Sequence, residues 1–380
     1  MLNPLVSIVI PAYNSQEYIR DALRSAIAQT WSRKEIIVVD DGSSDRTLEV
    51  ARQFESNCVM VVRQKNQGAA AARNKALALS QGDYIQYLDA DDLLAPDKIT
   101  RQIEAARDSA RRRTLLSCAW GRFFFRYYQT KFIPTSLWSD LSPREWLIRK
   151  MTFGTYMIPG CWLVSRELTE AAGPWDTGLQ YDDDGEYFCR VLLASDKVRF
   201  VPEAKVYYRR SVSGSLSYIG TSAKKREDLW CSMQRHINYL RSLEDSEKAR
   251  AACISHLQRY IIEFYPDRRD IIEQAEELAR RLGGQLTSPL SWKSDFASAS
   301  AGHQRSQYGW GHLRKVIAQR IYFLIKGIFG WHIAKRARLF LPRLIWGSVR
   351  LWDKALFFLQ QKRRIVFWNG LPEQDSRVNG

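Results

Sequence analysis

The sequence predicts an α/β fold with a parallel sheet at its centre and a helical extension at its C-terminal end. Within the first hundred residues, four short and nearly continuous apolar runs alternate with segments of helical period. Strands that are apolar on both faces are typical of a parallel sheet covered by helices on both sides. Ligands of such sheets bind at the carboxyl ends of the strands, so a site is expected where these runs end.

Each of the four apolar runs is followed by polar residues. The runs cover residues 6–10, 35–39, 58–62 and 84–88. After them come Tyr13 and Asn14, Asp40 and Asp41, residues 64–68, and Asp89, Asp91 and Asp92. Because the carboxyl ends of parallel strands share one edge of a sheet, these four clusters are expected to lie together.

The remaining elements follow from spacing and from capping residues. Helices are expected at about 15–27, at 46–54 with an N-cap at Ser44 or Asp45, and at 68–79. Farther along, the pattern predicts strands at 115–125 and 159–164, and helices at 143–151 and after Ser165. Two closing strands are expected at 199–203 and 205–210, before a basic, hydroxyl-rich loop at 209–217 that could fold over a diphosphate.

Asp89, Asp91 and Asp92 place three carboxylates within four positions. Like charges this close repel, and a hard divalent cation with oxygen ligands relieves the repulsion. An acidic turn that caps the helix after Pro96 is the alternative interpretation. The polar clusters at the other strand ends favour the binding site.

A second acidic group precedes a helix that runs through Phe188 and Leu192. It consists of Asp182, Asp183, Asp184 and Glu186. Acids at a helix start interact favourably with the helix dipole, by roughly 0.3–1 kcal/mol each, so capping is one explanation. Four acids exceed what one helix start needs, which leaves a catalytic role open for some of them.

Several function classes lack their motifs. No Gly-x-Gly-x-x-Gly follows the first strand, and no Gly-x-x-x-x-Gly-Lys-Ser/Thr occurs in the chain. A dinucleotide dehydrogenase or a P-loop enzyme would therefore lack its phosphate-binding loop. A nucleoside diphosphate could approach the acidic edge with a metal ion bridging the two.

The positive charge is concentrated near the C-terminus. Of the net +16, residues 311–370 contribute +12, with thirteen Lys or Arg against one acid, Asp353. Clustered cations with interspersed tryptophans at helical period favour a helix lying on an anionic membrane surface. A helical subdomain that packs on the core with its cations in water is an equal alternative, and no recognised motif supports nucleic-acid binding.

Five regions are expected. They are a catalytic domain at 1–220, a helical extension at 221–282, a flexible linker at 283–309, a basic amphipathic helical segment at 310–370 and a tail at 371–380.

Cysteine spacing and the lack of long apolar stretches bound the location of the protein. The six cysteines include no Cys-x-x-Cys pair, so they are expected to be free, mostly buried thiols rather than zinc ligands. The apolar run at 6–10 is too short for a signal peptide, and no apolar stretch reaches the roughly 20 residues of a spanning helix. A cytoplasmic protein is expected, peripheral on the cytoplasmic face of a membrane if the basic segment binds lipid.

Residues 5–217 resemble the family 2 glycosyltransferases. Five blocks in family order carry the resemblance: VSIVIPAYN at 6–14, EIIVVDDGSSD at 35–45, QGAAAARN at 67–74, YLDADD at 87–92 and DDDGE at 182–186. The resemblance implies the GT-A fold, a Rossmann-like mixed sheet with helices on both faces. It also implies an inverting, metal-dependent transfer of a sugar from a nucleoside-diphosphate sugar to a saccharide or lipid-linked acceptor. Such enzymes act in the synthesis of cell-surface polysaccharide, lipopolysaccharide or glycolipid.

The resemblance also implies roles for individual residues. Pro11, Tyr13 and Asp41 match positions that hold the base and ribose, Arg73 lies near the nucleotide and Asp89 near the ribose. Asp91 matches the ligand of the divalent metal, Mg²⁺ or Mn²⁺, and Asp184 matches the catalytic base. The family usually has Glu before that base, and this chain has Asp183 there, so Asp183 is the alternative base.

Two rival functions are less favoured by the sequence. A nucleotidyltransferase of similar fold would need a glycine-rich phosphate loop with a basic residue after the first strand, which is missing. A non-catalytic sugar-nucleotide-binding protein would keep Asp41 and the fold, but would not need the acids at 182–186.

Overall fold

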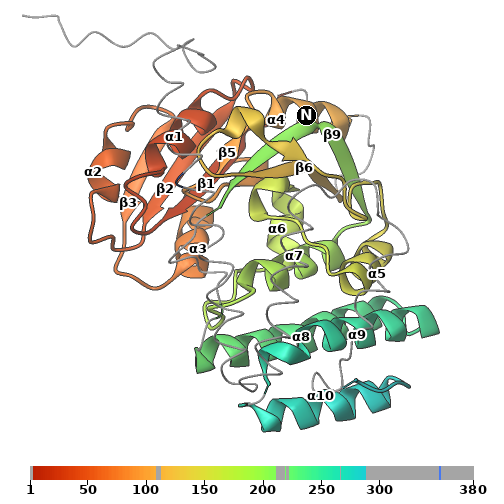
Figure 1. Ribbon diagram of the computed structural model, residues 1–380. Coiled ribbons are helices and arrows are strands. Elements are labelled where there is room, and N and C mark those ends of the chain that lie inside the picture. The colour runs from red at the N-terminus through yellow and green to blue at the C-terminus, as the bar shows by residue number, and fades with distance from the viewer. Residues whose placement is uncertain are drawn as a thin grey trace, which may run out of the picture.

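The computed structural model describes residues 3–107, 113–210, 219, 222–265, 267–287 and 351. These residues form one mixed sheet with helices on both faces and a further layer of helices beyond one face (Figure 1). The strand order is β3-β2-β1-β4-β8-β6-β9-β5, with β7 paired to β6. This architecture confirms the predicted α/β class and the GT-A type of sheet.

The first half of the sheet is parallel, as predicted. It consists of β1 (Val6–Ala12), β2 (Lys34–Asp40), β3 (Val59–Arg63) and β4 (Tyr84–Tyr87), with β1 between β2 and β4. Ile8, Val9 and Ile10 of β1 are fully buried, which explains why this strand is apolar on both faces.

The second half of the sheet mixes strand directions. It contains β5 (Leu93–Leu94), β6 (Thr114–Phe123), β7 (Lys131–Phe132), β8 (Leu163–Ser165) and β9 (Lys197–Arg209). β8 joins the halves by pairing antiparallel with both β4 and β6, and β9 runs parallel to β6. The strand predicted at 159–164 begins late, because residues Pro159–Cys161 form a 3-10 turn.

The prediction of two closing strands was wrong, because β9 is one strand with a bulge. Val201 pairs with Cys118 and Lys205 pairs with Ala119, so the intervening residues of β9 have no partner on β6. Pro202 lies in the bulge, where its lack of an N–H costs no ladder hydrogen bond.

Helices cover both faces of the sheet (Figure 1). On one face lie α1 (Ile19–Ile27), α2 (Thr47–Arg52) and α4 (Lys98–Arg107). On the other lie α3 (Ala69–Leu79), α6 (Arg166–Ala172) and α7 (Asp183–Ala194). The N-cap of α2 is Arg46 rather than Ser44 or Asp45, although Asp45 Oδ1 still accepts a hydrogen bond from the Thr47 N–H at 2.9 Å.

α5 (Pro143–Phe153) has a regular capping pattern at both ends. The Ser142 hydroxyl accepts a hydrogen bond from the Glu145 N–H, Pro143 starts the helix, and Gly154 ends it with a φ of 63°. All six cysteines are free, and four of them are buried, which confirms the prediction from their spacing.

The helical extension consists of α8 (Ala223–Leu243), α9 (Glu247–Tyr260) and α10 (Arg269–Arg281). α8 packs against α7, α9 against α5, and α10 against α9 (Figure 1). The helices of the described part of the chain include none that is both long and apolar enough to cross a membrane. Apart from residues 283–287 and 351, the predicted linker, basic segment and tail lie outside the described residues.

Candidate active site

The polar residues after β1 and β2 meet at the carboxyl edge of the parallel half. The Asn14 N–H donates to the Ser43 hydroxyl at 3.0 Å, and the Asn14 side chain accepts from the Ser44 N–H at 2.9 Å. Asn14 has a φ of 47°, in the left-handed region, and these bonds hold it there. Pro11 lies in β1, and the side chain of Tyr13 is 51% exposed beside this joined pair of loops.

Asp41 follows β2 and is buried, with its carboxylate already engaged by the chain. Oδ1 accepts from the Gln64 side chain at 2.8 Å and from the Gln67 N–H at 2.9 Å, and Oδ2 accepts from the Gly68 N–H at 2.8 Å. Gly68 has a φ of 93° at the start of α3. Asp41 therefore fixes the loop that leads into α3, and its two oxygens retain capacity for one further donor.

Arg73 of α3 connects the two acidic segments. Its Nη2 donates to Asp89 Oδ1 at 2.9 Å and its Nη1 donates to Asp183 Oδ2 at 2.8 Å. The side chain is only 6% exposed, and its guanidinium lies 4.4 Å from the ring centre of Trp175. Burial acts to lower the pKa of Arg73, but the charges of Asp89 and Asp183 outweigh it and the pKa is raised. Arg73 is therefore a permanent cation between the acids.

A cluster of buried aromatic rings lies next to the Arg73 guanidinium. Trp175 stacks on Tyr187 with ring centres 4.1 Å apart, and the hydroxyls of Tyr87 and Tyr187 share a hydrogen bond of 2.6 Å. Tyr87 ends β4, one residue before Leu88 and two before Asp89. Because Tyr87, Trp175 and Tyr187 are buried, the platform under the guanidinium is rigid.

The 89–92 segment is held by Arg209, at the end of β9. The Arg209 N–H donates to Asp92 Oδ1 at 2.8 Å, and its Nε donates to the backbone oxygen of Asp91 at 2.8 Å. Asp92 is fully buried, and its Oδ2 has no partner among the described residues. Arg209 was predicted both at the end of the closing strand at 205–210 and at the start of the loop at 209–217. The structure buries it at the end of β9, and residues 211–218 of that loop lie outside the described residues.

The acids of this segment repel one another electrostatically. Burial and the charge of Asp89 raise the pKa of Asp91 to about 6. Burial, followed by the charges of Asp91 and Asp89, raises the pKa of Asp92 well above its ordinary value. A divalent cation would relieve this repulsion, and Mg²⁺ is commonly held by one or two carboxylates together with phosphate oxygens and water. Asp91, the predicted metal ligand, supplies one such carboxylate, so the segment fits such an ion.

No group of three or more His, Cys, Asp or Glu side chains in the described ranges is arranged to hold a metal ion by itself. A surface hollow lined by α4 and β9 residues, among them Arg101 and Arg199, includes none of the predicted site residues.

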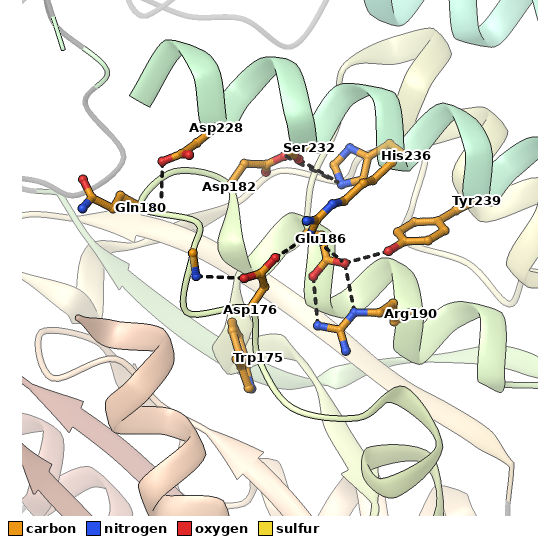
Figure 2. Close-up of polar contacts among 12 residues, drawn as sticks. Trp175, Asp176, Gln180, Asp182, Glu186, Arg190, Asp228, Ser232, His236 and Tyr239 are labelled. Atoms are coloured by element: carbon orange, nitrogen blue, oxygen red, sulfur yellow. Dashed lines mark hydrogen bonds and ion pairs between the residues drawn. The ribbon is translucent and has the colours of Figure 1, made fainter. Parts of the chain in front are cut away.

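The acidic side chains of the second segment, residues 182–186, point in two directions. Asp183 faces Arg73, and the charge of Arg73 also reaches Asp184. Asp182 and Glu186, one helical turn apart, point instead toward α8 (Figure 2). Asp182 Oδ2 accepts a hydrogen bond from the Ser232 hydroxyl, and Glu186 Oε1 accepts one from the Tyr239 hydroxyl at 2.7 Å. Asp182 makes no side-chain cap of α7, so simple capping does not account for this acid.

Asp184 is suited to exchange a proton near neutral pH. Burial, followed by the charges of Asp183 and Asp182, raises the pKa of Asp184 to about 7. Its only hydrogen bond within the described residues comes from the adjacent Gly185 N–H at 2.9 Å. Asp183 is engaged by Arg73, so of the two predicted bases Asp184 has the freer carboxylate.

Comparison with known proteins identifies the family of the N-terminal part of the chain. The family model described as "Glycosyl transferase family 2" matches residues 7–173. Residues 7–173 form a family 2 glycosyltransferase domain.

The family 2 domain has relatives among proteins that carry a name. TuaG of Bacillus subtilis, named for teichuronic acid biosynthesis, is 42% identical over 104 residues, 27% of this chain and 41% of TuaG. EpsH of the same organism, named as a glycosyltransferase, is 37% identical over 221 residues, 56% of this chain and 63% of EpsH. The matches thus span about two fifths to under two thirds of these two relatives.

A solved structure with the same fold extends beyond the family 2 domain. S. aureus TarS 1–349, in complex with UDP-GlcNAc, superposes with a TM-score of 0.59 at 18% identity, covering 91% of this chain and 92% of that chain. At this identity the comparison shows the shared fold.

Sequence reasoning missed several residues that shape the site. Trp175 carries no recognisable motif, and its position beside the Arg73 guanidinium depends on tertiary packing. Ser232 and Tyr239 of α8 carried no motif and lie beyond residue 173, the end of the family 2 match. Their i, i+7 spacing on one helical face was the only available signal.

Proposed function

We propose that this chain transfers a sugar from a nucleoside-diphosphate sugar to a hydroxyl group of a saccharide or lipid-linked acceptor, with inversion at the anomeric carbon. The observation that carries the proposal is Arg73, which binds Asp89 on one side and Asp183 on the other. The acids predicted to face the donor and those predicted to activate the acceptor thus meet around one guanidinium.

The comparisons support the donor class and a role in cell-surface polysaccharide, lipopolysaccharide or glycolipid synthesis. TarS, which shares the fold, binds UDP-GlcNAc, and TuaG is named for the synthesis of teichuronic acid. On the donor side we assign Pro11, Tyr13 and Asp41 to the base and ribose, and Asp89 to the ribose. Tyr13 supports this assignment because its exposed ring is available to a planar base.

We assign Asp91 to a divalent metal, Mg²⁺ or Mn²⁺. When bound, such an ion stabilises the negative charge that develops on the leaving diphosphate. Arg73 stays in place as a fixed positive charge between the acids, held by Trp175 and by its two carboxylate partners.

We assign Asp184 as the base that takes the proton of the acceptor hydroxyl. A hydroxyl is a poor nucleophile until its proton is removed, and a positioned base contributes roughly 10²–10⁴-fold. A pKa of about 7 matches this task near neutral pH. One base acting on the face opposite the leaving group gives inversion.

The test is a panel of sugar nucleotides incubated with the protein and Mn²⁺, with and without saccharide acceptors. The proposal expects release of nucleoside diphosphate from one or a few donors, increased by the right acceptor. Release of sugar 1-phosphate instead, with transfer of the nucleoside monophosphate, would identify a nucleotidyltransferase. Tight binding without release from any donor would identify a non-catalytic binding protein.

The metal assignment has a separate test in donor binding. Titration of UDP or GDP with increasing Mn²⁺, followed by calorimetry, should show metal-dependent affinity for the wild type. Asp91→Ala should remove this dependence, and Asp97→Ala, which alters an exposed acid paired with Arg101, serves as the matched control. An unchanged metal titration for Asp91→Ala would refute Asp91 as the ligand.

We also propose that the basic segment at 310–370 binds an anionic membrane surface. Its thirteen cations against one acid, with interspersed tryptophans, support this contact. The full chain should co-sediment with vesicles containing phosphatidylglycerol and should be released by high salt. A truncation ending near residue 300 that still co-sediments would refute the assignment to this segment.

A further inference from the structure

The first turn of α7 is held in place from outside the family 2 match. Asp182 precedes α7 in a left-handed conformation, with a φ of 58°, which is uncommon for a residue other than glycine. The two residues that follow it are the predicted bases. The orientation of Asp184 therefore depends on what fixes Asp182.

The carboxylate of Asp182 is enclosed by Gly185 and by α8. A Cβ atom at Gly185 would lie 2.1 Å from Asp182 Oδ1, so only glycine leaves room for this oxygen. Oδ2 accepts a hydrogen bond from the Ser232 hydroxyl, and Ser232 is fully buried. Within the described ranges, Ser232 is the only side chain that donates a hydrogen bond to this carboxylate.

His236 lies one turn further along α8, next to the contact between Ser232 and Asp182 (Figure 2). Its Nε2 is 3.5 Å from the Ser232 oxygen and 3.7 Å from Asp182 Oδ2. Burial, followed by the charge of Lys150, lowers the pKa of His236 well below its ordinary value, so the ring is neutral. Asp182 thus receives a hydroxyl hydrogen bond rather than a cationic partner from α8.

A second attachment lies on the other side of the predicted bases. Glu186 is 1% exposed and accepts from the Tyr239 hydroxyl and, at 2.9 Å, from two nitrogens of Arg190. Arg235 of α8 lies 3.6 Å from the same carboxylate and 2.6 Å from Asp176. α8 therefore contacts the start of α7 both before and after the pair Asp183–Asp184 (Figure 2).

We propose that Ser232 is a positioning residue for the transfer reaction, acting through Asp182 to orient the first turn of α7 and its base Asp184. This inference rests on the proposed function. It makes α8 part of the catalytic apparatus, although α8 lies beyond the residues that match the family. Among the described residues, Ser232 supplies the only hydrogen-bond donor to the Asp182 carboxylate, whose charge also interacts with that of Lys150.

Ser232→Ala should lower kcat by about tenfold to hundredfold, since small displacements of a reacting group cost rates of that order. The KM for the donor and the Kd for the nucleotide should stay within about twofold of the wild type, because Ser232 does not contact the donor-side residues. Ser242→Ala is the matched control on the same helix, since its exposed hydroxyl donates to the Tyr239 backbone oxygen and has no other partner among the described residues, and it should leave kcat unchanged.

A double-mutant cycle tests whether the effect passes through Asp182. Ser232→Ala combined with Asp182→Ala should be no slower than the slower single variant, because both changes remove one contact. Multiplying effects on kcat would overturn the proposal. So would a wild-type kcat in Ser232→Ala, or a loss of kcat matched by an equal loss of nucleotide binding.

Hydrogen exchange supplies a readout that does not depend on turnover. In Ser232→Ala, amides of residues 182–187 should exchange faster, while those of β1 to β4 stay protected as in the wild type. Unchanged exchange at 182–187 would overturn the proposal even if activity fell. If the wild type transfers no sugar from any donor, the proposed function itself fails, whereas an active wild type with an equally active Ser232→Ala refutes only the role of Ser232.

Discussion

The acids at 89–92 and those at 182–186 lie on either side of Arg73, yet they are held by different parts of the chain. Asp91 and Asp92 follow β4 and are fastened by Arg209 of β9, within the sheet. Asp182 and Glu186 are fastened by α8, outside the sheet. The first segment thus inherits its geometry from strand pairing, and the second depends on the packing of one helix on another.

Because of this difference, we expect the two halves of the candidate site to respond differently to mutation. The sheet-held segment sits in a core of fully buried strands, where movement is costly. The helix-held segment depends on a few hydrogen bonds, each contributing about 1 kcal/mol or somewhat more with a charged partner. Changes in α8 are therefore expected to act on the acceptor side and to spare donor binding.

The largest expected effect comes from the acceptor side itself. Asp184→Asn should reduce transfer by roughly 10²–10⁴-fold, because the amide cannot take the acceptor proton. Nucleotide affinity, measured by calorimetry, should stay near that of the wild type. Asp183→Asn is the informative comparison: if it abolishes transfer while Asp184→Asn remains active, the base is Asp183.

The next largest effect is expected where the two segments meet. Arg73→Met leaves Asp89 and Asp183 without their shared cation and should lower the free energy of unfolding by about 3 kcal/mol, at the low end for a buried pair because both carboxylates are partly exposed. Arg46→Met, which breaks a pair that is 70% and 55% exposed, should leave the unfolding midpoint close to that of the wild type in the same urea titration. Equal losses would mean that Arg73 is no more than a surface ion pair.

A smaller effect is expected from the second attachment of α7. Tyr239→Phe removes the hydroxyl that donates to buried Glu186, while Arg190 still binds that carboxylate. The expected loss in unfolding free energy is about 1–2 kcal/mol. Tyr13→Phe, which removes a hydroxyl from a half-exposed ring, should be neutral in the same measurement, and a comparable loss there would contradict this account.

The smallest expected effect concerns the pH dependence of kcat. Asp184 must be deprotonated to act as a base, and its pKa is raised to about 7 by burial and then by Asp183 and Asp182, so kcat should fall as the pH drops through about 7. Asp182→Asn removes one of these negative charges and should move this acid limb to lower pH. The pH dependence of folding stability has the opposite sign to that of a carboxylate in an ordinary ion pair. Because the folded state holds the Asp184 proton longer than the unfolded chain, this group favours the folded state least above pH 7.

The sheet-held half of the site could be predicted from the sequence because its signals are local. Parallel strands buried on both faces appear as apolar runs, and the polar residues at their ends are adjacent in sequence, as with Asp40, Asp41 and Asp89. The division of the other acids could not be predicted this way. Whether Asp182 faces a substrate or a serine depends on α8, which begins some forty residues later and shows only the general pattern of a charged helix.

Two further differences have similar physical reasons. Two closing strands were predicted at 199–203 and 205–210, but a bulge lets β9 continue as one strand past Pro202, which cannot donate a ladder hydrogen bond. Arg209 was expected both in the closing strand at 205–210 and at the start of the basic loop at 209–217, and the structure places it at the end of β9. Its burial between the Tyr18 and Phe123 rings depends on α1 and β6, which lie far from it in sequence.

The sheet order has a consequence for how such proteins can diverge. β3, β2, β1 and β4 come from one continuous stretch of chain that ends at residue 87, and among the described strands only β8 joins this stretch to the rest of the sheet. A chimera that keeps residues up to β4 and the 89–92 turn, but takes its later strands and helices from a relative, would preserve the half assigned to the donor. Acceptor preference could then be exchanged as a module, provided that Arg73 finds an acid at the position of Asp183.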